Sequence, residues 1–374
     1  MKSLIFTLAL ISIQALQADL FRRSEEFPVT MPYTCRTVGY HSDDIDLISR
    51  IISSYRLAKK EHLGDSMWQM FFDKRHKKIH DFFMKNDFNS CAYILRNPKD
   101  SDLFYGFDSL NVSVLPDHLN PAALTGLGHV CLDELVRFGE AISAIKLNNP
   151  EQYGNPASLR SWYADDVLNR IETKLNTQIF FPNPYEDEIG ICTFRGVASY
   201  RAISALYQAY LINEHVKGIE NPKILEIGAG LGRTAYYARL FGIKDYTIID
   251  IPISNLSQAY FLGKVLGDDQ IVLLGEAPEQ DKIKILTPDK FLNEIEQRYD
   301  LILNVDSLTE MNEATIDAYI KKICRSTPLF ISINHEANKY TVGDFALKCN
   351  NLKSCEKKPY WMRNGYAEEV YKFE

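Results

Sequence analysis

The sequence predicts an α/β fold in which a doubly wound parallel sheet follows a mainly helical N-terminal region. In the second half of the chain, short apolar runs alternate with segments of helical periodicity, which is typical of strands covered on both faces. Three glycines spaced by single residues separate the first of these runs from the helix that follows. In the first half, apolar residues recur three and four positions apart, as expected for helices.

The N-terminal half has helical patterns over residues 45–55, 67–83 and 130–142, and a further helix is expected over 159–175. Its aromatic residues fit either a core or a carbohydrate-binding platform; they are Trp68, Phe71, Phe72, Phe82 and Phe83. The turn-rich passage "FFPNPYEDEIG" then interrupts the pattern. We therefore expect a helical cap or acceptor-binding region over 19–180 and an α/β domain over 181–374.

In the second half, a helix over 197–216 leads into a strand at 223–227. Further strands are expected at 246–250, 270–274, 299–305 and 328–334. The helices between them begin at residue 232, cover 256–266, lie near residue 291 and cover 314–324. Ligands of such sheets bind beyond the carboxyl ends of the strands.

The stretch "ILEIGAGLGR" contains Glu226 and the glycines at 228, 230 and 232 (Gly228, Gly230 and Gly232). Glycines allow a ligand to approach the backbone closely. A dinucleotide fingerprint would need a glycine where Arg233 stands. Glu226 can offset a positive charge on the ligand. Asp250, at the end of the second strand, can accept hydrogen bonds from ribose hydroxyls.

The spacing E-x-G-x-G-x-G resembles motif I of class I methyltransferases that use S-adenosylmethionine, a Rossmann-like fold. Together with "TIIDIP", "YDLILNVDSLTEMNEATIDAYI" and "KPYWMRNGYAEEVY", it is similar to a family described as sugar O-methyltransferases, associated with bacterial surface polysaccharides. The similarity covers roughly residues 190–374. The positions that match the family pattern are Asp250, Pro252, Asn304, Ser307, Glu310 and Met311.

The resemblance implies S-adenosylmethionine as cofactor and a hydroxyl of a sugar or surface-glycan precursor as methyl acceptor. Glu226, the three glycines and Asp250 would bind the cofactor. Glu276, just past the expected third strand, stands where an adenine or ribose neighbour would be.

The acceptor hydroxyl needs a base. The candidates follow the fourth and fifth strands: His335, whose ordinary pKa lies near neutrality, and the carboxylates Asp306 and Glu310. Asn334 could orient the acceptor, and Asn312 could cap the helix that follows Glu310. A divalent metal bound by Asp306, Glu310 or His335 would lower the hydroxyl pKa by coordination, but these residues show no fixed metal-ligand spacing, so no metal ligand is assigned.

The net charge of -7 argues against a nucleic-acid partner. The apolar run from Leu4 to Leu16, followed by Ala18, resembles a secretory signal peptide over 1–18. It is too short for a comfortable membrane span, and no transmembrane domain is expected. Export conflicts with a cofactor that is made in the cytosol. An exported, non-catalytic binding or scaffold protein that keeps the methyltransferase fold is therefore the alternative function.

The seven cysteines include no C-x-x-C pair, which argues against a zinc ribbon or a dense disulfide framework. Most are expected to be buried thiols. Cys349 and Cys355 could form a disulfide if the chain is exported.

Overall fold

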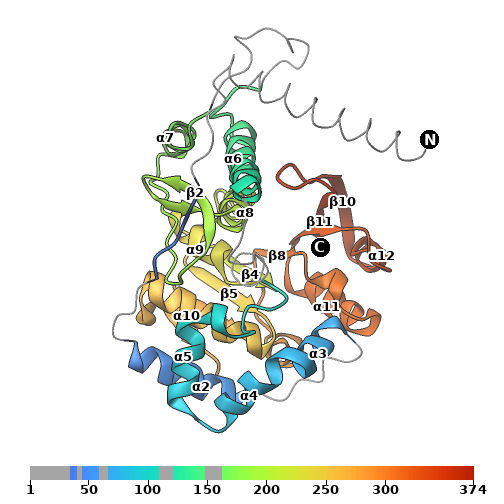
Figure 1. Cartoon of the computed structure of the whole chain (residues 1–374). Helices are drawn as coiled ribbons and strands as arrows, with labels where there is room; N and C mark the ends of the chain where they lie inside the picture. Colours follow the sequence, from blue (N-terminus) through green and yellow to red (C-terminus); the bar gives the residue numbers. More distant parts are fainter. Residues whose placement is uncertain (1–33, 40–43, 59–65, 109–120, 148–161) are drawn as a thin grey trace, which may run out of the picture.

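The computed structural model describes residues 34–39, 44–58, 66–108, 121–147 and 162–374 (Figure 1). The signal-like segment lies outside the described residues. None of the described helices combines the length and the apolar character that crossing a membrane would require.

A sheet of eight strands forms the centre of the described C-terminal half (Figure 1). Its strands, in spatial order, are β10 (Leu352–Pro359), β11 (Tyr366–Phe373), β9 (Leu329–His335), β8 (Leu301–Val305), β4 (Lys223–Ile227), β5 (Asp245–Ile249), β7 (Ile283–Leu286) and β6 (Ile271–Leu273). The six strands from β9 to β6 are parallel, whereas β11 is antiparallel to both of its neighbours. The expected doubly wound α/β fold is confirmed.

After β4, the chain adds β5 on one side of β4. It later adds β8 and β9 on the other side of β4. The order therefore reverses between β4 and β8, and a crevice at such a switch point is the usual ligand site of open α/β sheets. The glycine turn follows β4 directly, which places it at this crevice.

Alternating side chains of the central strands pack on opposite faces of the sheet. Ile224 belongs to a core shared with α8 (Tyr200–His215), α9 (Arg233–Leu240) and α10 (Pro252–Leu266). Leu225 belongs to a second core shared with α11 (Glu313–Ser326) and α12 (Gly343–Ala346). Asn312 caps α11 as expected, because its side chain accepts a hydrogen bond from the Thr315 amide at 3.0 Å.

The N-terminal half is mainly helical, as expected. Its helices are α2 (Ile45–Leu57), α3 (Met67–Phe71), a π-helical turn (Phe72–His76), α4 (Lys77–Met84), α5 (Phe88–Arg96), α6 (Pro121–Ala141) and α7 (Ala164–Leu175). In Figure 1, α2 to α5 lie below the sheet and α6 and α7 above it. Helix α2 packs closely on α10, since a Cβ at Gly263 would lie 2.7 Å from Leu47 Cδ1.

The two halves share one contiguous hydrophobic core. A small sheet also crosses the expected joint, because β1 (Thr34–Arg36) pairs antiparallel with β2 (Ile189–Thr193), which pairs with β3 (Gly196–Ala198). The boundary near residue 180 stays a prediction.

The expected third strand is confirmed as a strand. It forms the edge strand β6, and the four-residue strand β7 lies between β6 and β5. One further element differs from expectation, and one was not predicted. The helix near residue 291 is only the short π-helical turn Lys290–Glu294, and the chain ends in the hairpin β10–β11.

The cysteine pairing differs from the expected one. Cys35 and Cys192 form a disulfide that joins β1 to β2, with 5.6 Å between their Cα atoms. Cys349 and Cys355 are free, so their expected pairing is wrong. Cys355 lies exposed on the edge strand β10, whereas the partly buried Cys349 lies beside Cys324.

Removal of this disulfide is expected to destabilise the protein. The bridge spans 157 residues, and losing a native disulfide typically lowers the free energy of unfolding by about 2–5 kcal/mol. The double variant Cys35→Ser, Cys192→Ser should therefore unfold at lower urea concentration, whereas Cys355→Ser should behave as the parent protein. Equal urea midpoints for the double variant and the parent would contradict the prediction.

Candidate active site

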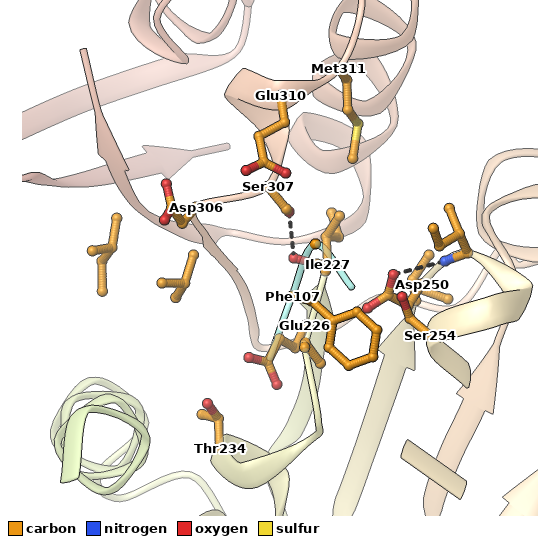
Figure 2. A pocket seen from close by; sticks show the side chains of 18 of the residues that line it. Phe107, Glu226, Ile227, Thr234, Asp250, Ser254, Asp306, Ser307, Glu310 and Met311 are labelled. Atoms are coloured by element: carbon orange, nitrogen blue, oxygen red, sulfur yellow. Dashed lines mark hydrogen bonds between the residues drawn. The ribbon is translucent and has the colours of Figure 1, made fainter. Parts of the chain in front are cut away.

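A cavity of about 560 Å³ opens at the carboxyl ends of β4, β5 and β8. Its walls come from the glycine turn, from the loops after these strands and from the N-terminal half, which contributes Trp68 and residues 106–108. Figure 2 shows labelled side chains on three sides of this space: Glu226 with Thr234, Asp250 with Ser254, and Asp306 with Ser307 and Glu310.

In the glycine turn, residues 228–232, the backbone of Gly228 and Gly230 faces the cavity without a side chain. Gly228 has φ +73°, and a Cβ there would lie 2.2 Å from Ser307 Oγ. Gly230 has φ +56° and no heavy atom within 4 Å of a built Cβ. Both line the cavity. Gly232 does not line it; it begins α9 and faces Leu262 instead.

Glu226 lies at the end of β4 and is 2% exposed. Tyr246 donates a hydrogen bond to its Oε2 at 2.8 Å. Burial raises the pKa of Glu226 to about 7, and the nearby Asp250 adds to the rise. A ligand cation at this end of the cavity would favour the charged carboxylate and reverse the shift.

Asp250 directly follows β5 and lines the cavity. Its Oδ1 accepts a hydrogen bond from the Ile251 amide at 2.8 Å, and its Oδ2 accepts one from Gln258 Nε2 at 2.7 Å. Gln258 also donates to the carbonyl of Gly230 at 3.0 Å, which couples Asp250 to the glycine turn. Burial raises the pKa of Asp250 to about 7. The Ala229 amide and the Ser254 side chain also interact with the carboxylate and oppose the effect of burial on its pKa.

Glu276 was expected beside the adenine or ribose of the cofactor, but it does not line the cavity. Its carboxylate receives hydrogen bonds from Arg50 Nε at 2.7 Å and from the Leu273 amide at 2.8 Å. The reason is the strand order: Glu276 follows the edge strand β6, whereas the strand beside β5 is β7. The residues that follow β7 and line the cavity are Pro288, Asp289, Leu292 and Asn293.

Glu310 and Asp306 lie on the same side of the cavity, after β8 (Figure 2). Trp68 Nε1 donates a hydrogen bond to Glu310 Oε2 at 3.1 Å. Burial raises the pKa of Glu310 to about 7, with Asp306 and Asp250 adding to the rise. A carboxyl with such a pKa is well matched to general-base catalysis near neutral pH.

Asp306 adopts φ +55°, which is uncommon for a residue with a side chain. Its Oδ2 accepts hydrogen bonds from Tyr366 Oη at 2.7 Å and from Arg363 Nη1 at 3.3 Å. Backbone strain of this kind is concentrated at functional sites. The two donors hold the Asp306 side chain in one orientation.

His335 does not line the cavity. Its Nδ1 accepts a hydrogen bond from the Ala337 amide at 3.2 Å, and its Nε2 lies 3.6 Å from Asp306 Oδ1. Both ring nitrogens therefore face protein atoms, and the geometry favours the carboxylates over His335 as the base.

The other polar residues of the family pattern support the glycine turn. Asn304 Nδ2 and Ser307 Oγ both donate to the carbonyl of Ile227, at 2.9 and 3.1 Å. Asn334 donates to Asn304 Oδ1 at 2.9 Å and does not line the cavity. Asn334 therefore supports the network and does not face the acceptor.

A buried ion network joins the cavity to the N-terminal half. Arg233 donates to Asp108 at 2.9 Å and to Glu188 at 2.7 Å, and Arg201 lies 3.1 Å from Asp108. Arg201 lines the cavity, whereas Arg195 pairs with Glu172 outside it. Sequence patterns gave no signal for the wall residue Asp108. Trp68 was noted only as one of several aromatic residues, and Arg363 and Tyr366 lie in the stretch KPYWMRNGYAEEVY but were assigned no role.

The described residues contain no cluster of three or more His, Cys, Asp or Glu side chains that could hold a metal ion.

No protein-family model matches the chain, and no curated protein matches it.

Solved structures resemble the chain at low similarity. Protein PH0226 of Pyrococcus horikoshii OT3 is 14% identical with a TM-score of 0.35, over 47% of this chain and 91% of that one. The methyltransferase domain of bacterial CtHen1 is 13% identical with a TM-score of 0.33, over 44% and 97%. The glycopeptide N-methyltransferase MtfA, complexed with S-adenosylmethionine, is 14% identical with a TM-score of 0.29, over 46% and 66%. At this distance the similarity carries no argument about function.

Proposed function

We propose that the chain is an S-adenosylmethionine-dependent methyltransferase whose acceptor is a hydroxyl of a sugar or glycan precursor. The observation that carries the proposal is one cavity that joins Glu226, the glycine turn and Asp250 to a second pair of carboxylates, Asp306 and Glu310. The first group fits a cofactor with an ammonium and a ribose, and the second fits a proton acceptor.

The charge of the cavity favours S-adenosylmethionine over a dinucleotide. More acids than bases line it: Asp108, Glu226, Asp250, Asp289, Asp306 and Glu310, against Arg201, Arg233 and Arg363. A pyrophosphate would bring negative charge into this acidic cavity, whereas a sulfonium and an ammonium bring positive charge. Among the cavity residues, Glu226 would hold the methionine ammonium and Asp250 the ribose hydroxyls.

The reaction is an in-line displacement. Bound S-adenosylmethionine would supply the methyl group: a lone pair of the acceptor oxygen would form a bond to the methyl carbon while the carbon–sulfur bond breaks, which would leave a neutral thioether. The hydroxyl proton moves to the Glu310 carboxylate. Much of the rate arises from holding the acceptor oxygen in line with the methyl group, which is the role of the surrounding cavity walls.

The sugar acceptor follows from the family resemblance and is testable in cells. Mass spectrometry of glycans from a strain that lacks the gene should reveal a sugar that has lost one methyl group. An unchanged glycan profile would contradict the sugar assignment.

A second candidate function is an exported binding or scaffold protein without turnover. The disulfide Cys35–Cys192 favours it, because disulfides persist in oxidising compartments. Turnover of S-adenosylmethionine by the purified chain would exclude the scaffold. Sequencing the mature N-terminus would establish whether residues 1–18 are removed.

Cofactor affinity is expected to depend on pH through Glu226 and Asp250. The pKa of each carboxyl is raised to about 7, so both are largely protonated below that pH in the free protein. A cationic ligand binds the deprotonated forms, so the affinity should fall as pH falls, by up to about tenfold per pH unit for each group. Titration calorimetry at about pH 6 and about pH 8 measures the difference.

Glu226→Gln provides the comparison, because it binds the ammonium less tightly but has one fewer group to deprotonate. Its affinity should be lower at high pH and should change less with pH than that of the parent. Parallel pH profiles for the variant and the parent would contradict the assigned role of Glu226.

A further inference from the structure

The Trp68 side chain connects the N-terminal half of the protein to Glu310, the proposed base. Trp68 belongs to α3, and Glu310 lies in a short turn after β8, 242 residues away. Trp68 Nε1 donates to Glu310 Oε2 at 3.1 Å, and both side chains line the cavity. Among the described residues, Trp68 is the side chain that donates a hydrogen bond to the Glu310 carboxylate.

The indole is held in place by its surroundings. Phe71 packs edge-on against it, with 5.6 Å between the ring centroids. Gly106 has φ +98°, and a Cβ there would lie 3.1 Å from Trp68 Cη2 and 2.9 Å from Phe71 Cδ2. Only a residue without a side chain lets both rings lie this close to the 106–108 segment of the cavity wall.

We propose that Trp68 is a positioning residue for Glu310, which rests on the proposed function. The indole N–H holds one carboxylate oxygen and leaves the other for the acceptor hydroxyl. Because the donor bonds to the charged carboxylate, it also favours the deprotonated, basic form of Glu310.

Charged groups from several elements face Glu310. Asp306 after β8 and Asp250 after β5 raise its pKa, whereas Arg201 on α8 lowers it. Tyr366 on β11 lies near enough for the Glu310 charge to raise the tyrosine's own pKa. Trp68 opposes the effect of the two acids by direct hydrogen bonding.

Trp68→Phe tests the proposal, because it keeps a ring and removes the N–H donor. The full chain is labelled with carbon isotope in its glutamate carboxyls, and the Glu310 resonance is identified as the one that Glu310→Gln removes. In Trp68→Phe, the pKa of Glu310 should rise by about one unit or more, since a hydrogen bond to a charged group contributes about 1.5–3 kcal/mol, or roughly one to two pH units.

Trp361→Phe is the matched control. Its indole Nε1 also donates a hydrogen bond, to the carbonyl of Arg137 at 3.0 Å, and Trp361 does not line the cavity. This variant should leave the Glu310 titration unchanged. An unchanged titration in Trp68→Phe, or an equal shift in Trp361→Phe, would overturn the proposal.

A measurement on the unaltered tryptophan covers the case in which Trp68→Phe does not fold. The indole N–H resonance of Trp68 should shift with the titration of Glu310, and this shift should be absent in Glu310→Gln. A Trp68 resonance that titrates identically in both proteins would also overturn the proposal. Calorimetry with S-adenosylmethionine separates the two inferences: absent binding contradicts the proposed function, whereas binding without coupling contradicts only the role of Trp68.

Discussion

Glu310→Gln is expected to lower the rate of methyl transfer by about 10²- to 10⁴-fold, the usual contribution of a general base. The amide keeps the size of the side chain and can still accept a hydrogen bond from Trp68, but it cannot take the hydroxyl proton. Affinity for S-adenosylmethionine should stay nearly unchanged, because Glu310 lies on a different side of the cavity from Glu226 and Asp250 (Figure 2). Single-turnover rates with labelled cofactor, together with calorimetry, measure both quantities.

His335→Ala is the informative comparison. Its ring nitrogens face Ala337 and Asp306, so the variant should retain most of the activity. A large loss in His335→Ala with full activity in Glu310→Gln would reassign the base to the histidine. Loss in Asp306→Asn alone would assign the step to that carboxylate.

Arg233→Met is expected to lower the free energy of unfolding by about 3–5 kcal/mol, the usual cost of breaking a buried ion pair from one side. Arg233 is 7% exposed and is the shared cation of the buried Asp108 and Glu188. Without it, both carboxylates would remain buried with their main partner lost. Because the network joins α9 to the N-terminal half, the cavity wall at Asp108 should also loosen.

Lys321→Met provides the control for Arg233→Met. Lys321 forms an exposed ion pair with Asp317 on α11, and such pairs contribute about 0–1 kcal/mol. Urea denaturation should therefore separate the two variants clearly. Similar urea midpoints would mean that the Arg233 network adds no more than a surface pair.

The elements that position the cofactor end of the site were predictable because their signals are local. The apolar run of β4, the glycine spacing and the acid after β5 lie within 28 consecutive residues, from 223 to 250. Glu276 could not be placed correctly, because the pairing of β7 with β5 is a long-range property. The run IKIL has only four residues and is interrupted by Lys284, so it does not stand out as a strand.

The side of the cavity proposed for the acceptor, beside Asp306 and Glu310, was less predictable, because it also depends on long-range contacts. Trp68 meets Glu310, and Asp108 meets Arg233, only through contacts between residues far apart in the sequence. Residue type favoured His335 as a base through its ordinary pKa, but the choice depends on what each ring nitrogen faces and on the burial of Glu310. Only the three-dimensional arrangement provides this information.

Binding of S-adenosylmethionine to the purified chain is the most direct measurement of the proposed function. Calorimetry should show one site for S-adenosylmethionine and for its demethylated product. Asp250→Ala should weaken binding by no more than about 1.5–3 kcal/mol, the contribution of hydrogen bonds to a charged group. Binding of NADH with no response to S-adenosylmethionine would contradict the assignment of this cavity.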